Sequence, residues 1–470
     1  MKLHEAFDVV RGDVVAFVGA GGKSSTLVGL GYELADLGWR VLASTTTYIE
    51  EEQLSLLPFA LQYRGDAHAV SQALSEYRFV FLYDRIENGR VYAPKLDWTP
   101  RLLDSVDSDV LLVEADKADG VAFKAPYGDE PTIPLEASLV VPVVSLSALD
   151  KPLDETTVYN PQAMTDKYGF YPNAPIYAPW IGQVLRDEEL GLKGVPTKAR
   201  VVVFLNQTNE EGYMRQRART IARSALRTPR IEAVAIGSVR AAVPIYEVQR
   251  AVGALVLAAG MSTRMGQPKL LLPWLDDKPI IQHIVENLLL ARMDYVCVVT
   301  GAYAEQVKQL LKPLEVRLAH NRNYKSGEML SSLQLGIRTM PKYVNACLVV
   351  LGDQPRLEQS VLYHMLKAYS EANRQIVVPT YQDRRGHPIL IGRRYWRDIL
   401  NLKAPQTLRD VLSAHADDIL HVDVGTDSIL HDIDTPQDYQ QQRLRAGLSL
   451  INPLPAPTTP PKPSSPKKEG

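Results

Sequence analysis

The segment GALVLAAGMSTRMGQPK, residues 253–269, runs from an apolar stretch into a loop with glycine and two cations. Its first five residues predict a buried strand. Glycine lets backbone N–H groups approach phosphate, and Arg264 and Lys269 offset phosphate charge. A solvated surface loop is the alternative, but the order of these features favours a nucleoside triphosphate site. The expected nucleotide-binding residues are Leu257, Ala258, Ala259, Gly260, Gly266 and Lys269.

Three later segments follow this loop in a fixed order. They are LVVLGDQP at residues 348–355, RRGHP at 384–388 and DIDTPQD at 432–438. With the first segment they resemble the MobA-like nucleotidyltransferases, most closely the molybdenum cofactor cytidylyltransferases, from Gly253 to near Tyr439. The Gly-His-Pro element is more typical of the cytidylyl branch of this family than of the guanylyl branch.

The resemblance implies transfer of CMP from CTP to a molybdopterin-type cofactor, with release of pyrophosphate. Two polyanions must meet in line, so catalysis is mainly positioning and charge neutralisation. We expect Mg²⁺ on Asp353 and Asp434, with Arg264, Lys269 and Asp353 as the catalytic residues. The alternative roles are turn initiation for Asp353 and helix capping for Asp434.

Two elements are candidates for binding the acceptor. Residues 321–332, NRNYKSGEMLSS, resemble a family loop in which Ser331 or Ser332 binds the acceptor phosphate, although helix capping would also explain these serines. His387 lies between glycine and proline before an apolar strand, and we expect it to line the acceptor pocket. A structural role is the alternative for this histidine.

The first half of the chain has a phosphate loop of its own. Residues 13–44 read as strand, loop GAGGKS, helix from 25 to 37 and strand, which is a βαβ unit. The loop is not a standard Walker A because Phe17 stands where that pattern has glycine, but it satisfies the compact Gly-x-x-Gly-Lys-Ser form of the Mur-type ligases. ATP or GTP is the expected ligand, and a glycine-rich turn without nucleotide is the alternative. The expected contacts are Gly19, Gly21, Gly22, Lys23 and Ser24.

Further polar residues follow neighbouring strands of this half. Thr45 follows the second strand, and Glu114 and Asp116 follow the apolar run 110–113. Ligands bind at such carboxyl edges, so these residues are expected to hold Mg²⁺, phosphate or a water. Residues 206–209, NQTN, resemble a guanine-reading motif but lack its lysine and aspartate, so we infer no preference for GTP.

The order of GAGGKSS, STTT, VEADKADG, FKAP, DEPTIP and VVSLSALDKPL resembles the YqeC-type selenium-dependent hydroxylase accessory proteins, over residues 5 to about 240. Relatives have Glu-Ala-Asp-Gly where this chain has EADKADG, so the roles of Asp116 and Asp119 stay open. Lys124 and Glu130 match the pattern and are expected to form a charged lip near the nucleotide.

Composition narrows the class of protein. The chain has 470 residues, 46% of them hydrophobic, and a formal charge of −2, which gives no reason to expect nucleic acid or membrane as a partner. Cys297 and Cys347 lie in apolar runs, where buried reduced thiols are expected. With no signal peptide and no apolar run of 18 residues, we expect a cytoplasmic protein.

The pattern predicts two doubly wound, Rossmann-like α/β domains and a tail. These are a P-loop-like accessory domain over 1–250, a nucleotidyltransferase domain over 251–448 and a disordered Pro-rich tail over 449–470. A Pro-rich docking ligand is the alternative for the tail. Residues 246–250 are expected to form a short connecting helix.

The resulting hypothesis is a bifunctional maturation factor for molybdenum hydroxylases, with a recipient hydroxylase as partner. One alternative keeps the transferase and replaces the acceptor with a sugar or polyol phosphate. Another is a cofactor-carrying chaperone whose nucleotide sites only regulate docking, which the set of Arg264, Lys269 and Asp353 disfavours.

Overall fold

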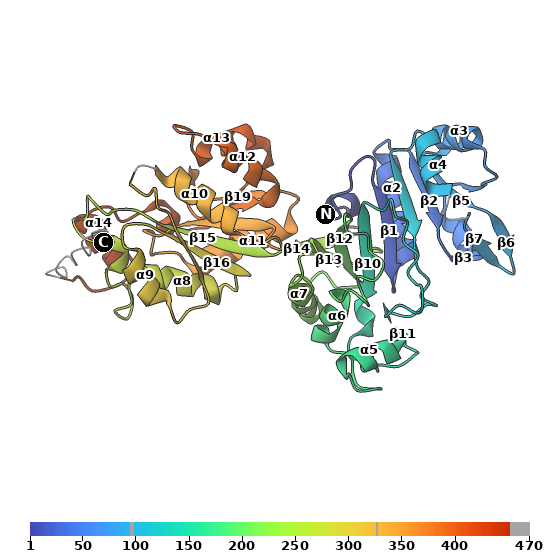
Figure 1. The fold of residues 1–470 in the computed structure, drawn as a ribbon, viewed down its shortest axis with the longest axis horizontal. Coiled ribbons are helices and arrows are strands. Elements are labelled where there is room, and N and C mark those ends of the chain that lie inside the picture. The colour runs from blue at the N-terminus through green and yellow to red at the C-terminus, as the bar shows by residue number, and fades with distance from the viewer. Residues whose placement is uncertain (95–97, 326–327, 452–470) are drawn as a thin grey trace, which may run out of the picture. The chain divides into compact units, whose positions relative to one another are not determined.

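The computed structural model describes residues 1–94, 98–325 and 328–451 (Figure 1). The chain divides into two compact units, Met1–Arg250 and Ala251–Gly470. Most of the expected tail, residues 452–470, lies outside the described residues. Across the described residues, no helix is long and apolar enough to cross a membrane.

The N-terminal unit is built on a nine-stranded sheet with the order β14-β13-β12-β10-β1-β8-β2-β5-β4. Neighbouring strands are parallel except for the antiparallel pair β13–β14. The strands are β1 Val14–Gly19, β2 Val41–Thr45, β4 Ala60–Gln62, β5 Phe79–Tyr83, β8 Val110–Glu114, β10 Leu139–Ser145, β12 Arg200–Asn206, β13 Ala233–Gly237 and β14 Ile245–Gln249.

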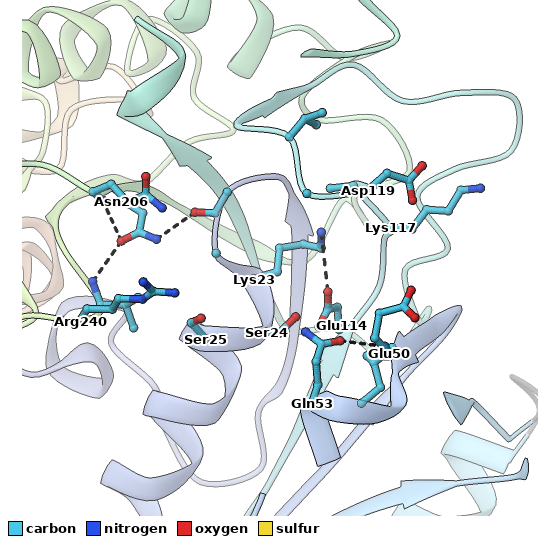
Figure 2. Close-up of a pocket in the computed structure, with 18 of the residues that line it drawn as sticks. Lys23, Ser24, Ser25, Glu50, Gln53, Glu114, Lys117, Asp119, Asn206 and Arg240 are labelled. Atoms are coloured by element: carbon cyan, nitrogen blue, oxygen red, sulfur yellow. Dashed lines mark hydrogen bonds and ion pairs between the residues drawn. The ribbon is translucent and has the colours of Figure 1, made fainter. Parts of the chain in front are cut away.

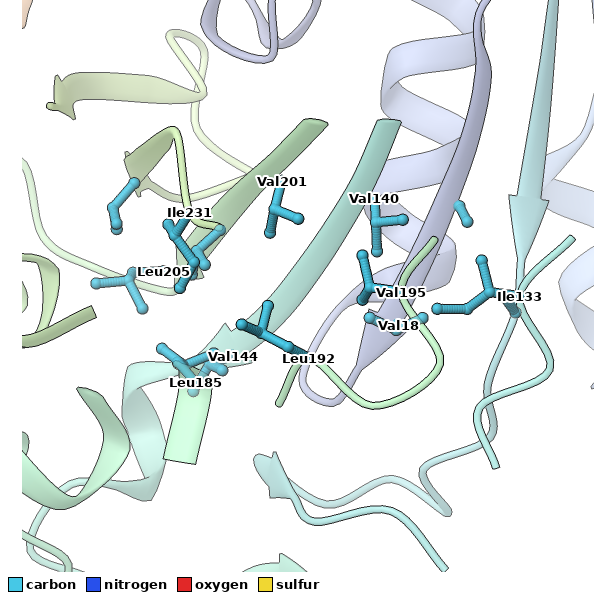
Figure 3. Close-up of a cluster of buried hydrophobic side chains, with 14 of the residues drawn as sticks. Val18, Ile133, Val140, Val144, Leu185, Leu192, Val195, Val201, Leu205 and Ile231 are labelled. Atoms are coloured by element: carbon cyan, nitrogen blue, oxygen red, sulfur yellow. The ribbon is translucent and has the colours of Figure 1, made fainter. Parts of the chain in front are cut away.

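Helices cover both faces of this sheet, as the predicted doubly wound fold requires. Alternate residues of β1 point to opposite faces, so Val14, Ala16 and Val18 enter one buried cluster and Val15 and Phe17 the other. Figure 3 shows the first cluster, where side chains of β1, β10 and β12 meet apolar residues from the connecting segments. The helices that contribute to it include α3 Ala67–Tyr77, α4 Trp98–Ser105, α6 Ala178–Leu185 and α7 Tyr213–Ala225, while α1 Leu3–Ala6 and α2 Lys23–Asp36 cover the other face.

Small elements are added to this core. A three-stranded antiparallel sheet has the order β3-β7-β6, and β9 pairs with β11. Their bounds, with those of the remaining helices, are β3 Tyr48–Glu50, β6 Arg85–Glu87, β7 Arg90–Tyr92, β9 Phe123–Lys124, β11 Val158–Tyr159, α5 Pro161–Tyr168, η1 Glu51–Leu56 and η2 Leu146–Ala148.

The prediction of a connecting helix at 246–250 is wrong, because Ile245–Gln249 forms the edge strand β14. Ile245 and Val248 are buried against the sheet. Glu247 is also fully buried, and its carboxylate is paired with Arg215 at 3.0 Å and Arg219 at 2.6 Å. Pairing makes a buried charge tolerable, so a segment with the composition of an exposed helix is accommodated as a strand.

The C-terminal unit holds an eight-stranded sheet with the order β17-β16-β15-β18-β21-β19-β20, and β22 also pairs with β19. The strands β15 to β18 are parallel, whereas β21 runs antiparallel to both β18 and β19. The strands are β15 Val252–Ala258, β16 Tyr295–Thr300, β17 Arg317–His320, β18 Ala346–Leu351, β19 Ile376–Tyr381, β20 Arg384–Arg385, β21 Ile389–Gly392 and β22 Ile419–Asp423.

Helices again cover both faces of the sheet, which confirms the predicted fold class. One buried cluster includes α8 Ile280–Leu290, α9 Ala304–Leu311, α11 Gln359–Glu371 and α14 Pro436–Arg445. The other includes α10 Glu328–Thr339, α12 Trp396–Asn401 and α13 Leu408–Ala414. The short 3-10 turns are η3 Lys269–Leu271, η4 Arg393–Tyr395, η5 Ala416–Asp418 and η6 Asp427–Leu430.

Both cysteines lie inside the C-terminal unit, on the two strands that flank β15. Cys297 on β16 and Cys347 on β18 are free and fully buried, as the sequence predicted. Burial raises the pKa of each thiol, so both stay protonated at neutral pH.

Because each unit has its own sheet and two buried clusters, we expect residues 1–250 and 251–451 to fold when expressed separately. Each fragment should unfold in one cooperative transition, followed by circular dichroism during heating. Fragments that aggregate under conditions in which the full chain is folded would contradict this expectation.

Candidate functional site

A cavity of about 230 Å³ lies in the C-terminal unit where β15 and β18 end. The loop after β15 supplies most of its wall, and aspartates from two later segments supply the rest. It is lined by Leu257, Ala258, Gly260, Met261, Ser262, Thr263, Arg264, Lys269, Leu270, Asp353 and Asp434.

The Lys269 ammonium connects the parts of this cavity. It donates to Asp353 Oδ2 at 2.7 Å, to the Ile433 carbonyl at 2.8 Å and to Asp434 Oδ1 at 3.1 Å. Arg264, on the exposed part of the loop, pairs with the other oxygen of Asp434 at 2.8 Å. The four side chains expected to act in transfer are therefore brought together around one point.

Close packing of the backbone places Asp353 and Asp434 side by side in this cavity. A Cβ at Gly352 would lie 2.8 Å from the Leu257 carbonyl oxygen, so glycine lets the end of β18 approach the end of β15. The Ile433 N–H donates to the Asp353 carbonyl at 3.0 Å, which places Asp434 beside Asp353. The N-cap of α14 is Thr435, so capping is not the role of Asp434.

Burial controls the charges at this site. Burial raises the pKa of Asp353, and the adjacent Lys269 ammonium offsets part of the rise. Burial alone would lower the pKa of Lys269, but the carboxylates of Asp353 and Asp434 outweigh it and raise that pKa. Lys269 is therefore a fixed positive charge at neutral pH.

The aspartate pair fits the ligand requirement of Mg²⁺. No group of three or more histidine, cysteine, aspartate or glutamate side chains among the described residues is arranged to hold a metal. Mg²⁺ bound to a nucleotide needs only one or two carboxylates, because phosphate and water oxygens supply the rest. Asp353 and Asp434 both reach the same ammonium within 3.1 Å, so they can face one small cation.

The expected acceptor residues do not line this cavity. Asn321 Nδ2 donates to Ser331 Oγ at 2.8 Å and to Ser332 Oγ at 2.9 Å, at the start of α10. His387 lines a separate small cavity, and burial lowers its pKa, so its imidazole is neutral at neutral pH. Their roles in acceptor binding stay predictions, as do those of Ala259 and Gly266, which are also outside the cavity wall.

The N-terminal unit holds a larger cavity, of about 510 Å³, around its glycine loop (Figure 2). Gly19, Gly21 and Gly22 all have positive φ, which favours glycine at each position. The loop ends at Gly22, the N-cap of α2, whose first N–H groups are open to an anion. The cavity is lined by Gly21, Gly22, Lys23, Ser24, Ser25, Tyr48, Ile49, Glu50, Gln53, Glu114, Lys117, Ala118, Asp119, Gly120, Val121, Asn206, Gln207, Ser238, Val239 and Arg240.

Lys23 and Glu114 form the charged centre of this cavity. Lys23 is only 5% exposed, and its ammonium donates to the Gly19 carbonyl at 2.9 Å and lies 3.7 Å from Glu114 Oε1. Burial raises the pKa of Glu114, while Lys23 and a hydrogen bond from Ser24 oppose the rise. The arrangement places the Lys23 ammonium, the Ser24 hydroxyl and the Glu114 carboxylate together in the wall of the cavity.

Asp116 and Thr45, expected at the nucleotide, are not among the residues that line this cavity. Asp116 accepts from the Gly19 N–H at 3.1 Å and pairs with buried Lys124, which also donates to Glu130 at 2.8 Å. The predicted charged lip is thus a buried network that supports the loop. The Thr45 hydroxyl donates to the Glu114 carbonyl at 2.9 Å, and its role in nucleotide binding stays a prediction.

Several cavity residues were missed by the sequence reasoning. Lys117, Glu50 and Gln53 lie on the same side of Lys23 as Glu114, whereas Arg240 lies on the opposite side (Figure 2). Arg240 follows β13, and the only signal for it was a Gly-Ser pair after an apolar strand. For Asn206, the sequence offers only its place in an incomplete guanine motif.

Comparison with known proteins gives a match for each unit. The YqeC protein family model matches residues 15–162, and the MobA-like NTP transferase domain model matches 254–419. The uncharacterized protein YqeC of Escherichia coli is 28% identical over 240 residues, covering 49% of this chain and 89% of the relative. The molybdenum cofactor cytidylyltransferase of Escherichia coli is 26% identical over 190 residues, covering 40% of this chain and 94% of the relative.

A solved nucleotidyl transferase from Methanothermobacter thermautotroptrophicus is 26% identical over 42% of this chain and 100% of that chain, with a TM-score of 0.37. The family model, the relatives and the converging cations and carboxylates define the C-terminal unit as a nucleotidyltransferase. The chain joins a YqeC domain at its N-terminus to a MobA-like NTP transferase domain at its C-terminus.

Two glycines allow the loop geometry to be tested. Gly21 and Gly38 both have φ of +82°, but a Cβ at Gly21 would lie 2.3 Å from Ser145 Cβ, whereas nothing lies within 4 Å at Gly38. Gly38→Ala should cost about 1–2 kcal/mol from backbone strain alone. Gly21→Ala should cost clearly more, measured as the free energy of unfolding of residues 1–250 in urea. Equal losses would show that the loop yields to the added methyl group.

Proposed function

We propose that the C-terminal unit transfers CMP from CTP to a molybdopterin-type cofactor and releases pyrophosphate. The observation that carries this proposal is the convergence of Arg264, Lys269, Asp353 and Asp434 on one cavity. The cytidylyltransferase relative supports the choice of CTP and of the acceptor.

In the proposed reaction, an acceptor phosphate oxygen attacks the α-phosphorus of CTP. The bond from that phosphorus to the bridging α,β-oxygen breaks, and pyrophosphate leaves with the electron pair. Asp353 and Asp434 would hold Mg²⁺, which supplies charge neutralisation on the phosphates. Lys269 and Arg264 turn from the carboxylates to the β- and γ-phosphates and stabilise the leaving pyrophosphate.

The proposed product serves a molybdenum hydroxylase, to which the cofactor is passed. The motifs of the N-terminal unit support this context, because their order resembles that of selenium-dependent hydroxylase accessory proteins. We further propose that this N-terminal unit binds ATP or GTP, with phosphate at the loop amides and Lys23, and Mg²⁺ at Ser24 and Glu114.

The choice of substrates is tested by pyrophosphate release from the purified full chain. CTP with molybdopterin should give release well above that with GTP, ATP or UTP. Release with a sugar or polyol phosphate, and none with molybdopterin, would replace the proposed acceptor. No release with any combination would contradict the proposal.

Asp353→Asn should lower the rate of CMP transfer by about 100-fold or more, because a charged ligand at the transition state is lost. Circular dichroism should show an unchanged fold. Asp417→Asn is the matched control, since Asp417 is exposed and lies outside the cavity wall. Near-normal turnover by folded Asp353→Asn would remove Asp353 from the catalytic set.

Lys23→Ala should abolish ATP or GTP binding by the N-terminal unit and leave CMP transfer nearly unchanged. Lys23 is the cation at the centre of the loop cavity, so its loss removes the side-chain charge that faces the phosphates. Titration calorimetry of residues 1–250 measures the binding. A wild-type fragment that binds no nucleotide would support the alternative of a structural glycine turn.

A further inference from the structure

The two ends of the N-terminal cavity differ in charge. Figure 2 shows Glu50, Glu114, Lys117 and Asp119 on one side of Lys23, and Asn206 and Arg240 on the other. The carboxylates of the cavity wall therefore lie at one end. Ser24 and Glu114 at that end would hold a divalent cation, which would neutralise charge on the terminal phosphates.

Asn206 fixes the opposite end of the cavity to the glycine loop. Its side chain is buried, donates to the Gly21 carbonyl at 2.9 Å and accepts from the Val239 N–H at 3.0 Å. A Cβ at Gly22 would lie 2.3 Å from the same amide nitrogen. Asn206 thus holds the segment that carries Arg240 at a set position relative to the phosphate loop.

The side chains at this end present hydrogen-bond donors. The carboxamide oxygen of Gln207 accepts from Ser145 Oγ at 2.6 Å, which leaves its amide nitrogen as the group for a ligand. Arg240 is exposed and carries only donors. We refer to Gln207, Ser238 and Arg240 as the donor corner; all three line the cavity.

We propose that the nucleoside of the triphosphate bound by the N-terminal unit lies at the donor corner, and that its base presents carbonyl oxygens, as guanine does. The inference rests on the proposed nucleotide site of this unit. With the metal and terminal phosphates at the carboxylate end, the phosphate chain crosses the loop and its nucleoside reaches the donor corner. Guanine offers two acceptors, O6 and N7, to arginine, whereas adenine replaces O6 with an amino donor.

The test uses the full chain and titration calorimetry with GTP, ATP and inorganic tripolyphosphate, each with Mg²⁺. Binding that disappears in Lys23→Ala is assigned to the N-terminal site, which separates it from the C-terminal cavity. GTP should bind this site at least tenfold more tightly than ATP. Arg240→Ala should weaken the binding of GTP about tenfold and leave the binding of tripolyphosphate unchanged, since tripolyphosphate has no base.

Gln207→Glu keeps the oxygen that meets Ser145 and replaces the donor with an acceptor. This substitution should weaken the binding of GTP and reduce the difference in affinity between GTP and ATP. Arg64→Ala, at an exposed arginine outside the cavity wall, is the control and should change nothing.

Three results would overturn the inference. Equal affinity of the N-terminal site for ATP and GTP would contradict the assignment of the base. If Arg240→Ala weakens the binding of GTP and of tripolyphosphate equally, Arg240 contacts the phosphates and not the base. If Lys23→Ala leaves all binding unchanged, the proposed nucleotide site itself fails. That result differs from the first two, in which binding at the loop persists.

Discussion

The contacts of the Lys269 ammonium fix the geometry of the C-terminal cavity. This one group joins the strand-end loop to Asp353, 84 residues later, and to Asp434, 165 residues later. A largely buried ammonium is costly unless it is paired, so the three segments stabilise one another through it. The same constraint recurs in the N-terminal unit, where buried Lys23 faces Glu114 and buried Lys124 joins Asp116 to Glu130. In both units a lysine organises the ends of neighbouring parallel strands.

Much of the fold could be predicted because the strands are apolar runs of the right length. The runs at 253–257 and 348–351 became β15 and β18, and the first loop sits between β1 and α2 as expected. Strand ends in a parallel sheet lie at one edge, so the sequence also placed Lys269 and Asp353 at a common site. The positions of these strands could be predicted because a short stretch of sequence is enough to determine each of them.

The contacts between distant segments could not be predicted, because they depend on the order of strands in the sheet, which no short stretch of sequence determines. Asn206 contacts the glycine loop from 185 residues away because β12 lies two strands from β1. Asp116 was expected at the nucleotide from its place after an apolar strand, yet Lys124 and the Gly19 N–H occupy its oxygens. The sequence of β14 predicts a helix, because Glu247 has the character of an exposed residue and its two arginine partners are distant in the sequence.

The positions of the cysteines provide a chemical reporter of one unit alone. The chain has only two thiols, and both lie within the central strands of the C-terminal sheet. A protonated, fully buried thiol does not react with alkylating reagents, so labelling requires the sheet to open. The rate of alkylation therefore records the opening of the transferase domain, and unfolding of the N-terminal unit contributes no signal.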